Sequence, residues 1–239
     1  MSQWIDIHNH LLPAVDDGAV SLDQTRRMLQ IAYEEGIHLI IATPHYGAGC
    51  CNMDKEILLR KLELVQKEAG LIDPGFEIEL GNEVFYSEDI TEHLRQKKAM
   101  TLAGTRYVLV EFAKADDYQT IRTGIHRLLM YGYLPVLAHV ERYHCLYENY
   151  EGIYELIRLG AYMQMNISSI IPGKHGSGFC RRLLEYDLIQ LMGTDSHSDF
   201  IRAPKIKDGI RIIRKKFGVE VLNRLMFENP VKLLKNQYI

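Results

Sequence analysis

The chain has 239 residues, 47% of them hydrophobic, and its formal net charge is −3 at pH 7. This length is enough for one α/β domain with a large core, and the charge gives no electrostatic footprint for nucleic acid. The first residues lack the basic-then-apolar pattern of a signal peptide, and no apolar run approaches the ~20 residues of a membrane-spanning helix. We therefore expect a cytoplasmic protein with no membrane insertion and no nucleic-acid partner.

Seven short segments along the chain have the composition of buried strands. They are mostly apolar and often β-branched, as strands of a parallel sheet covered on both faces are. We predict strands at residues 4–9, 38–43, 77–83, 107–112, 134–139, 162–166 and 188–193.

Amphipathic segments with helical periodicity lie between or after these strands. Ser21 is a candidate N-cap for the first, and Gly36, Gly70, Gly132 and Gly160 follow the ends of the first four. We predict helices at residues 21–35, 54–69, 119–131, 150–159, 205–217 and 219–227, with a final turn at 230–235.

The alternation of strands and helices predicts a parallel α/β architecture. No Pro/Gly/Ser-rich linker interrupts it, so we expect a single domain over residues 1–239. A closed barrel is more natural for this pattern than an open sheet. The first strand is not followed by G-x-G-x-x-G, which argues against a dinucleotide-binding fold.

Polar side chains of the kinds that bind metals follow nearly every predicted strand. His8 and His10 are two residues apart, so on a strand they project from the same face. In a barrel the carboxyl ends of all strands meet at one mouth, where active sites form. The candidates in chain order are His8, His10, Asp17, His45, Glu83, Glu111, His139, Asp195 and His197.

This donor set indicates a cluster of metal ions. Imidazole and carboxylate ligands suit zinc, manganese or iron, and the set is too large for one ion. Two or three neighbouring ions with a bridging carboxylate would activate a water for phosphoryl transfer. Arg142 and Arg202 lie three and five residues after the candidate ligands His139 and His197, and a phosphate dianion needs such planar, bidentate donors.

The same residues resemble the motifs of the PHP (polymerase and histidinol phosphatase) superfamily. These motifs are D-x-H-x-H, T-P-H, G-N-E, H-x-E-R and D-S-H, at residues 6–10, 43–45, 81–83, 139–142 and 195–197. Within it, LLPAVDDG, TPHY and HVERY are similar to the bacterial manganese-dependent tyrosine-protein phosphatases of the CpsB/CapC type. The resemblance covers nearly the whole chain. It implies a distorted (β/α)7 barrel with the metal site at the C-terminal ends of the strands.

The resemblance also implies how the donors divide among three divalent metal ions, manganese first and iron or zinc as alternatives. His8, His10, Glu83 and Asp195 would hold the first. Asp17, His45 and His197 would hold the second, and Glu83, Glu111 and His139 the third. Arg142 and Arg202 match the family's phosphate-binding arginines. Asp17 is a candidate general acid, with a water on the metals as the alternative, and Val140 stands where the family commonly has proline.

By this resemblance the protein would hydrolyse phosphotyrosine in proteins, on a bacterial tyrosine kinase that regulates capsular or exopolysaccharide export. Two alternatives stay open: a small-molecule phosphatase of the histidinol-phosphate type, and a non-catalytic interaction module with structural metals. The sequence has no long insertion to cover a small substrate, which favours an open mouth that accepts a protein tail.

The remaining histidines and aromatic residues near the strand ends are expected to have structural roles. Phe85 and Tyr86 follow Glu83 and are expected to pack against other side chains. Asn166 could equally well support a metal ligand or form hydrogen bonds with buried polar groups of the core. The histidines expected to be structural or exposed are His38, His93, His126, His144 and His175.

The cysteines predict free thiols in a reducing compartment, because none has C-x-x-C spacing and two are adjacent. Cysteine phosphatases carry an arginine six residues after the nucleophile. The residues six after Cys50, Cys51, Cys145 and Cys180 are Glu56, Ile57, Glu151 and Tyr186. A cysteine nucleophile is therefore not expected.

Overall fold

The computed structural model describes residues 3–47, 49, 52–174 and 176–239, so Cys50, Cys51 and His175 lie outside the described residues. The described strands all pair in parallel, in the orders β1-β2-β4 and β3-β5-β6-β7-β8-β9. This confirms the predicted parallel α/β architecture. The strands are β1 Trp4–Asn9, β2 Ile37–Ala42, β3 His45–Tyr46, β4 Glu77–Leu80, β5 Glu83–Phe85, β6 Tyr107–Glu111, β7 Leu134–Leu137, β8 Tyr162–Asn166 and β9 Leu191–Gly193.

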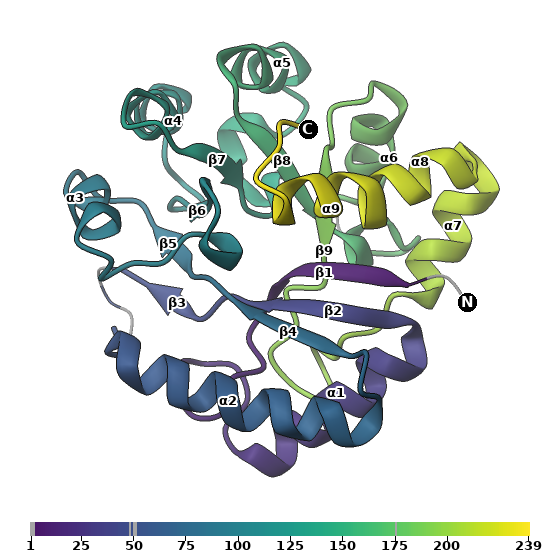
Figure 1. The fold of residues 1–239 in the computed structure, drawn as a ribbon. Coiled ribbons are helices and arrows are strands. Elements are labelled where there is room, and N and C mark those ends of the chain that lie inside the picture. Colours follow the sequence, from purple (N-terminus) through teal and green to yellow (C-terminus); the bar gives the residue numbers. More distant parts are fainter. Residues whose placement is uncertain (1–2, 48, 50–51, 175) are drawn as a thin grey trace.

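Helices surround the strands in Figure 1, with α1 and α2 below them and α4 and α5 above. The helices are α1 Leu22–Glu35, α2 Lys55–Ile72, α3 Ile90–Arg95, α4 Tyr118–Met130, α5 Tyr150–Leu159, α6 Ser177–Glu185, α7 Lys207–Phe217, α8 Val219–Asn223 and α9 Asn229–Leu234. A π turn at Arg224–Glu228 joins α8 to α9. As predicted, the Ser21 side chain caps α1, where it accepts a hydrogen bond from Gln24 N.

Two of the strand segments that lead to the mouth are interrupted: the predicted strand 38–43 corresponds to β2 and is followed by the unpredicted β3, and the predicted strand 77–83 is split. Pro44 follows β2 and has no N–H for a ladder, so the strand stops and resumes as β3. The predicted strand 77–83 breaks between β4 and β5, where the side chain of Asn82 replaces ladder bonds. Asn82 Nδ2 donates to Pro44 O at 2.8 Å, and Asn82 Oδ1 accepts from Met100 N at 2.9 Å.

The predicted end of the second helix at Gly70 is wrong, because α2 continues to Ile72 and its last bond runs from Asp73 N to Ala69 O. Burial of Ala69 and packing of Ile72 against the core outweigh the weak helix propensity of glycine. The helices α3 and α6 were not predicted.

Apolar side chains form two separate clusters. The larger one lies between the strands and the surrounding helices, and a smaller one joins residues such as Ile5, Ile7 and Leu109 in the space that the strands enclose. Leu233 of α9 belongs to this inner cluster together with Tyr107 and Leu134, which begin their strands. The C-terminal helix therefore closes the end of the strands opposite to their carboxyl ends.

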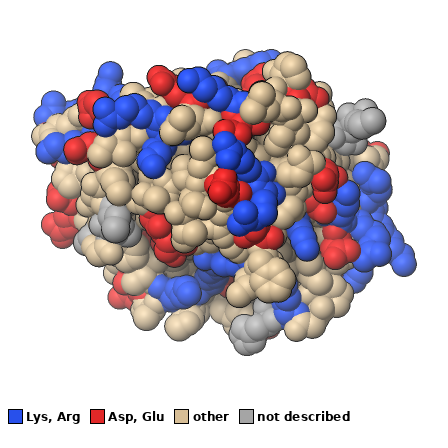
Figure 2. All heavy atoms as spheres, turned by 90° about the horizontal axis from the view of Figure 1, so that it is seen from below, with Lys and Arg blue, Asp and Glu red and all other residues tan. Residues whose placement is uncertain are grey.

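The surface shown in Figure 2 carries Lys and Arg among Asp and Glu, with other side chains between them. Such a mixture agrees with the small net charge. Lys and Arg gather toward the right edge of this face and alternate with Asp and Glu over the rest of it. None of the described helices combines the length and the apolar character needed to cross a bilayer.

Candidate functional site

The carboxyl ends of the strands bring all nine predicted metal ligands to one region. His8 lies in β1 and His10 directly after it, and the register against β2 shifts between Asp6 and Asn9. Such irregularities re-aim side chains next to active sites. The other donors come from the loop after β1 (Asp17), from β3 (His45), from β5 (Glu83), from β6 (Glu111), and from just beyond β7 (His139) and β9 (Asp195 and His197).

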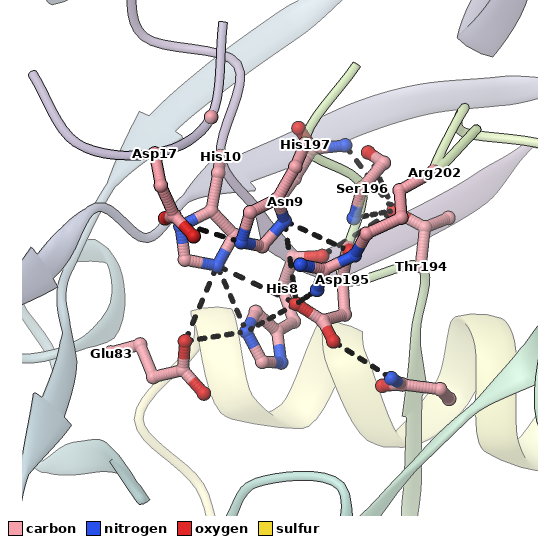
Figure 3. Close-up of polar contacts among 12 residues, drawn as sticks. His8, Asn9, His10, Asp17, Glu83, Thr194, Asp195, Ser196, His197 and Arg202 are labelled. Carbon is pink, nitrogen blue, oxygen red and sulfur yellow. Dashed lines mark hydrogen bonds and ion pairs between the residues drawn. The ribbon is translucent and has the colours of Figure 1, made fainter. Parts of the chain in front are cut away.

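Four of these side chains form the most buried group. His8 Nε2 lies 3.1 Å from Glu83 Oε2 and 3.5 Å from Asp195 Oδ1, and His10 Nε2 lies 3.3 Å from Glu83 Oε2. Figure 3 shows the two imidazoles and the two carboxylates pointing at one another. One donor atom from each of the four residues lies within 4.8 Å of all the others. This is the set expected for the first ion.

Two further groups adjoin the first. His10, Asp17, His45 and His197 form one, with Asp17 Oδ1 at 3.3 Å from His45 Nε2. The Asp17 side chain is 67% exposed, so this group opens to solvent.

The last group joins Glu83, Glu111 and His45. His139 lies beside it, with Nε2 at 2.9 Å from Glu83 Oε1 and 3.4 Å from Glu111 Oε1. The carboxylate of Glu83 thus touches the first and third groups, as a bridging ligand would. Two residues belong to one more group than predicted: His10 also lies in the second group, and His45 also lies in the third.

The environment of Glu83 fits divalent cations. Its Oε2 is buried without a hydrogen-bond partner, and imidazole nitrogens of His8, His10 and His45 lie 3.1 to 3.3 Å away. Burial opposes ionisation of this carboxyl, but the histidines hold its pKa well below the usual range. Such a carboxylate oxygen, with no hydrogen-bond partner and with several imidazole nitrogens around it, offers the mixed oxygen and nitrogen ligands that Mn²⁺, Fe²⁺ or Zn²⁺ bind.

Two polar residues that were not predicted orient the histidine rings. Asp16 Oδ2 lies 2.8 Å from His10 Nδ1 and accepts from His45 N at 3.1 Å. Gln164 Oε1 lies 3.2 Å from His8 Nδ1 and accepts from His139 N at 2.7 Å. These contacts direct each ring's Nε2 toward the donor cluster, as outer carboxylates and amides do at metal sites. The sequence held two signals that could have identified these residues. Asp16 adjoins the predicted ligand Asp17, and Gln164 is a polar residue within a predicted buried strand.

Asn166, whose role stayed open, supports a predicted ligand. Its Nδ2 donates to Asp195 Oδ2 at 2.9 Å, and its Oδ1 accepts from Gln164 Nε2 at 2.9 Å. Asp6 lies beneath the cluster, where its buried carboxylate accepts hydrogen bonds from Thr194 N and Asn9 Nδ2. These bonds connect β8, the end of β1 and the segment after β9.

The backbone is strained at two of the predicted ligands. His139 has φ of 32° and Asp195 has φ of 53°, which non-glycine residues adopt rarely. Such conformations concentrate at functional sites, where the surrounding structure holds them. Val140 begins the short 3-10 helix Val140–Arg142 and is fully buried, so its side chain packs in the core.

Both predicted phosphate-binding arginines point into the site. Arg142 Nη2 lies 2.5 Å from Asp195 Oδ2, and Arg202 Nη2 lies 2.6 Å from Asp195 Oδ1. Figure 3 shows Arg202 extending from its loop toward this carboxylate. Burial opposes ionisation of Asp195, but His8, Arg142 and His10 lower its pKa below the usual range. Two guanidinium groups thus meet at the edge of the first donor group.

Comparison with known proteins identifies the family. The family model described as "Capsular polysaccharide synthesis, CpsB/CapC" matches residues 4–235. The chain belongs to the CpsB/CapC family.

Two curated relatives in this family span the whole chain. The tyrosine-protein phosphatase CpsB of Streptococcus agalactiae is 33% identical over 242 residues, covering 98% of this chain and 100% of the relative. The tyrosine-protein phosphatase YwqE of Bacillus subtilis is 32% identical over 237 residues, covering 98% and 93%.

A crystal structure from work on YwqE from Bacillus subtilis and CpsB from Streptococcus pneumoniae, described as unique metal-dependent tyrosine phosphatases, superposes with a TM-score of 0.91. Its identity to this chain is 32%, and the match covers 98% of this chain and 96% of the solved one.

Two of the histidines and one of the aromatic residues that were expected to have structural roles make contacts of that kind. His38 Nδ1 lies 3.0 Å from Gly36 O, and His93 Nδ1 lies 3.2 Å from Tyr46 Oη. Tyr86 stacks on Phe112 with ring centroids 4.8 Å apart, as expected for packing. Burial raises the pKa of the Cys180 thiol to about 12, which makes it a poor nucleophile.

Proposed function

We propose that this protein is a metal-dependent protein-tyrosine phosphatase, as its CpsB and YwqE relatives are named. The observation that carries the proposal is the meeting of Arg142 and Arg202 at Asp195, which is itself part of the first donor group. A purely structural metal site has no use for two guanidinium groups at its open edge. A phosphate monoester needs both the cationic donors and the metals.

The proposed roles of the donor residues follow their grouping. Three divalent ions, manganese first and iron or zinc as alternatives, would be held by the nine ligands, with Glu83 shared. Ions held there would supply the Lewis acidity that activates a water and offsets the charge on phosphate oxygens. The proposed first set is His8, His10, Glu83 and Asp195, the second Asp17, His45 and His197, and the third Glu83, Glu111 and His139.

Arg142 and Arg202 would exchange their contacts with Asp195 for bidentate contacts to phosphate oxygens, which holds phosphorus in line with the attacking water. The water oxygen bonds to phosphorus and gives up one proton, the bond to the tyrosine oxygen breaks, and that oxygen takes one proton, so the number of protons is unchanged. A phenol with a pKa near ~10 needs only a weak acid. The two candidates for this proton transfer are a water held in the site and Asp17, which is exposed at the mouth and could act only while its carboxylate is not bound to a metal.

The strand pairing supports the finer fold assignment, a single PHP-type (β/α)7 barrel over residues 1–239. Because β2 continues as β3 and β4 as β5 after two residues each, the nine strands correspond to seven passes of the chain. The passes would close through the bonds His10 N to Ser196 O at 2.9 Å and Asp195 N to His8 O at 2.8 Å.

The biological setting is proposed from the family. Its description names capsular polysaccharide synthesis. We propose a cytoplasmic enzyme whose substrate is a phosphotyrosine protein, in the first place a bacterial tyrosine kinase that regulates polysaccharide export.

The test is the kcat/KM of the Mn²⁺-loaded protein on a phosphotyrosine peptide and on histidinol phosphate. We expect preference for the peptide. His8→Ala and Arg142→Ala should each lower kcat/KM by ~100-fold or more, because a ligand or a transition-state donor is lost. Arg122→Ala, an exposed arginine on α4, is the matched control and should change little. Preference for histidinol phosphate would assign a small-molecule phosphatase, and no metal-dependent turnover of either would favour an interaction module.

A further inference from the structure

A groove adjoins the two arginines and the donor residue Asp195. Its volume is about 680 Å³, and Arg142, Asp195 and Arg202 line one part of it. This volume lies within the range of pockets that bind whole small molecules, so a phosphate group alone would leave much of it empty. The groove therefore has room for residues next to the phosphotyrosine.

The charges along the groove favour an anionic occupant. Three exposed lysines line it, Lys174, Lys205 and Lys207, and we call this set the lysine groove. Two of its acidic side chains already have partners. Glu35 Oε2 accepts from Lys207 N at 2.7 Å and from Ile206 N at 2.8 Å, and Asp208 Oδ1 lies 2.9 Å from Arg211 Nη2. The third, Asp195, lies between the two arginines.

One wall of the groove is a firmly held loop with apolar side chains at its tip. His197 N donates to Arg202 O at 2.9 Å, which ties the two ends of the loop together. Asp199 anchors it to α1, with Oδ1 accepting from Gln24 Nε2 at 2.9 Å. Despite these bonds, Phe200 is 84% and Ile201 is 87% exposed. Two large apolar side chains on a fixed loop are typical of a contact surface.

We propose that the lysine groove binds an acidic segment of the substrate protein, in which Asp or Glu residues lie close in sequence to the phosphotyrosine. The proposal rests on the proposed phosphatase function. With the phosphate at Arg142 and Arg202, the adjoining peptide enters the groove, its carboxylates meet the lysines, and its apolar groups meet Phe200 and Ile201. The groove thereby selects among phosphotyrosine sites by their neighbours.

The experiment compares kcat/KM of the Mn²⁺-loaded protein on four phosphotyrosine peptides that differ only in the residues beside the phosphotyrosine. The flanks are acidic, neutral, basic, or neutral with a second phosphotyrosine. Exposed charge contacts contribute modestly each, so we expect a preference for the acidic over the neutral peptide of roughly 5- to 20-fold at low salt. This ratio should shrink in 0.5 M NaCl, because salt screens such contacts.

Variants assign the preference to the groove. The triple variant Lys174→Ala/Lys205→Ala/Lys207→Ala should bring the acidic-to-neutral ratio close to one, and Lys205→Glu/Lys207→Glu should turn it toward the basic peptide. Lys67→Ala, an exposed lysine on α2, is the matched control and should keep the wild-type ratio.

Several outcomes would overturn the inference. Equal kcat/KM on all four peptides would overturn the role of the groove but leave the phosphatase function intact. A preference for the acidic peptide that survives in the triple variant would have the same meaning. A gain only with the second phosphotyrosine would assign a second phosphate site instead. If no phosphotyrosine peptide is turned over at all, the proposed function itself fails, which is a different result.

Discussion

The hydrogen bond between His10 Nδ1 and Asp16 decides how that ring can act. The Asp16 carboxylate accepts a hydrogen bond from Nδ1–H at 2.8 Å, which leaves Nε2 facing Glu83 and Asp195. Gln164 on β8 does the same for His8. At the scale of single residues, the site therefore depends as much on these supporting groups as on the ligands.

Replacing Asp16 by asparagine should weaken metal binding. The amide cannot supply the negative charge that orients and polarises His10, so we expect the Kd for Mn²⁺ to rise by about 10- to 100-fold. Titration followed by the electron paramagnetic resonance of free Mn²⁺ measures this. Asp23→Asn, an exposed carboxylate on the first turn of α1, is the control. Equal affinities for the two variants would show that Asp16 has no supporting role.

The contact between His10 and Asp16 also predicts how the stability of the metal-free protein depends on pH. Burial opposes protonation of His10, but hydrogen bonds to Asp16 and Glu83 raise its pKa to about 10. Because this exceeds the unfolded value of about 6.5, the protonated ring stabilises the fold below pH 6.5, and that stability is lost as pH rises toward 10. Burial lowers the pKa of His197 to about 3, so that ring stays neutral in this window.

Urea unfolding of EDTA-treated protein between pH 6.5 and 9.5 tests this dependence. We expect the midpoint to fall with rising pH, and to fall less in His10→Ala, which lacks the titrating ring. A midpoint that is constant with pH, or an equal slope in the variant, would contradict the assignment.

At the scale of elements, close packing positions the segments that surround the mouth. Gly209 of α7 faces Ile167, which directly follows Asn166 at the end of β8. A Cβ at this position would lie 2.5 Å from Ile167 Cγ1 and 2.8 Å from its backbone oxygen. Glycine is thus required here because α7 closely approaches the short 3-10 helix that follows β8, although glycine is a poor helix former.

Gly209→Ala should lower the free energy of unfolding by about 1–3 kcal/mol, because the overlap with a backbone oxygen outweighs the gain in helix propensity. Gly70→Ala on α2 is the contrasting control. No neighbouring heavy atom lies within 4 Å of its Cβ position, so we expect a gain of up to ~1 kcal/mol. Denaturant unfolding compares the two. Stabilisation by both substitutions would disprove the predicted contact.

At the scale of the whole molecule, stability and chemistry occupy opposite ends of the strands. The inner apolar cluster fills the end where the strands begin, and α9 closes it with Leu233. The donor groups lie at the end where the strands finish. A change at one end can therefore alter the stability of the fold while leaving the reacting residues in place.

Leu233→Ala should lower the free energy of unfolding by about 2–5 kcal/mol, through lost burial and the cavity that remains. At a temperature where the variant is folded, its kcat/KM should stay within about twofold of the wild type. Leu71→Ala, at an 82% exposed position, should change stability by less than about 0.5 kcal/mol. A large loss of kcat/KM in the folded Leu233 variant would contradict this separation of the two ends.

The sequence by itself determined the alternation of strands and helices and the placement of nine donors at the ends of strands. The carboxyl ends of parallel strands meet at one edge whatever the exact bounds of each strand. The wrong helix end at Gly70 and the missed strand break at Asn82 therefore did not affect the prediction that the donor residues cluster. The short helices α3 and α6 were missed because they contain only six and nine residues, too few for a clear helical period.

Only the tertiary structure decided which atoms meet. Gln164 is 156 residues from the ring that it orients, and Arg142 and Arg202 meet at Asp195 from different loops. The lysine groove likewise combines residues from before α6 and from the start of α7. Such contacts depend on the direction of each side chain and on long-range packing, which hydrophobic periodicity and motif spacing do not record.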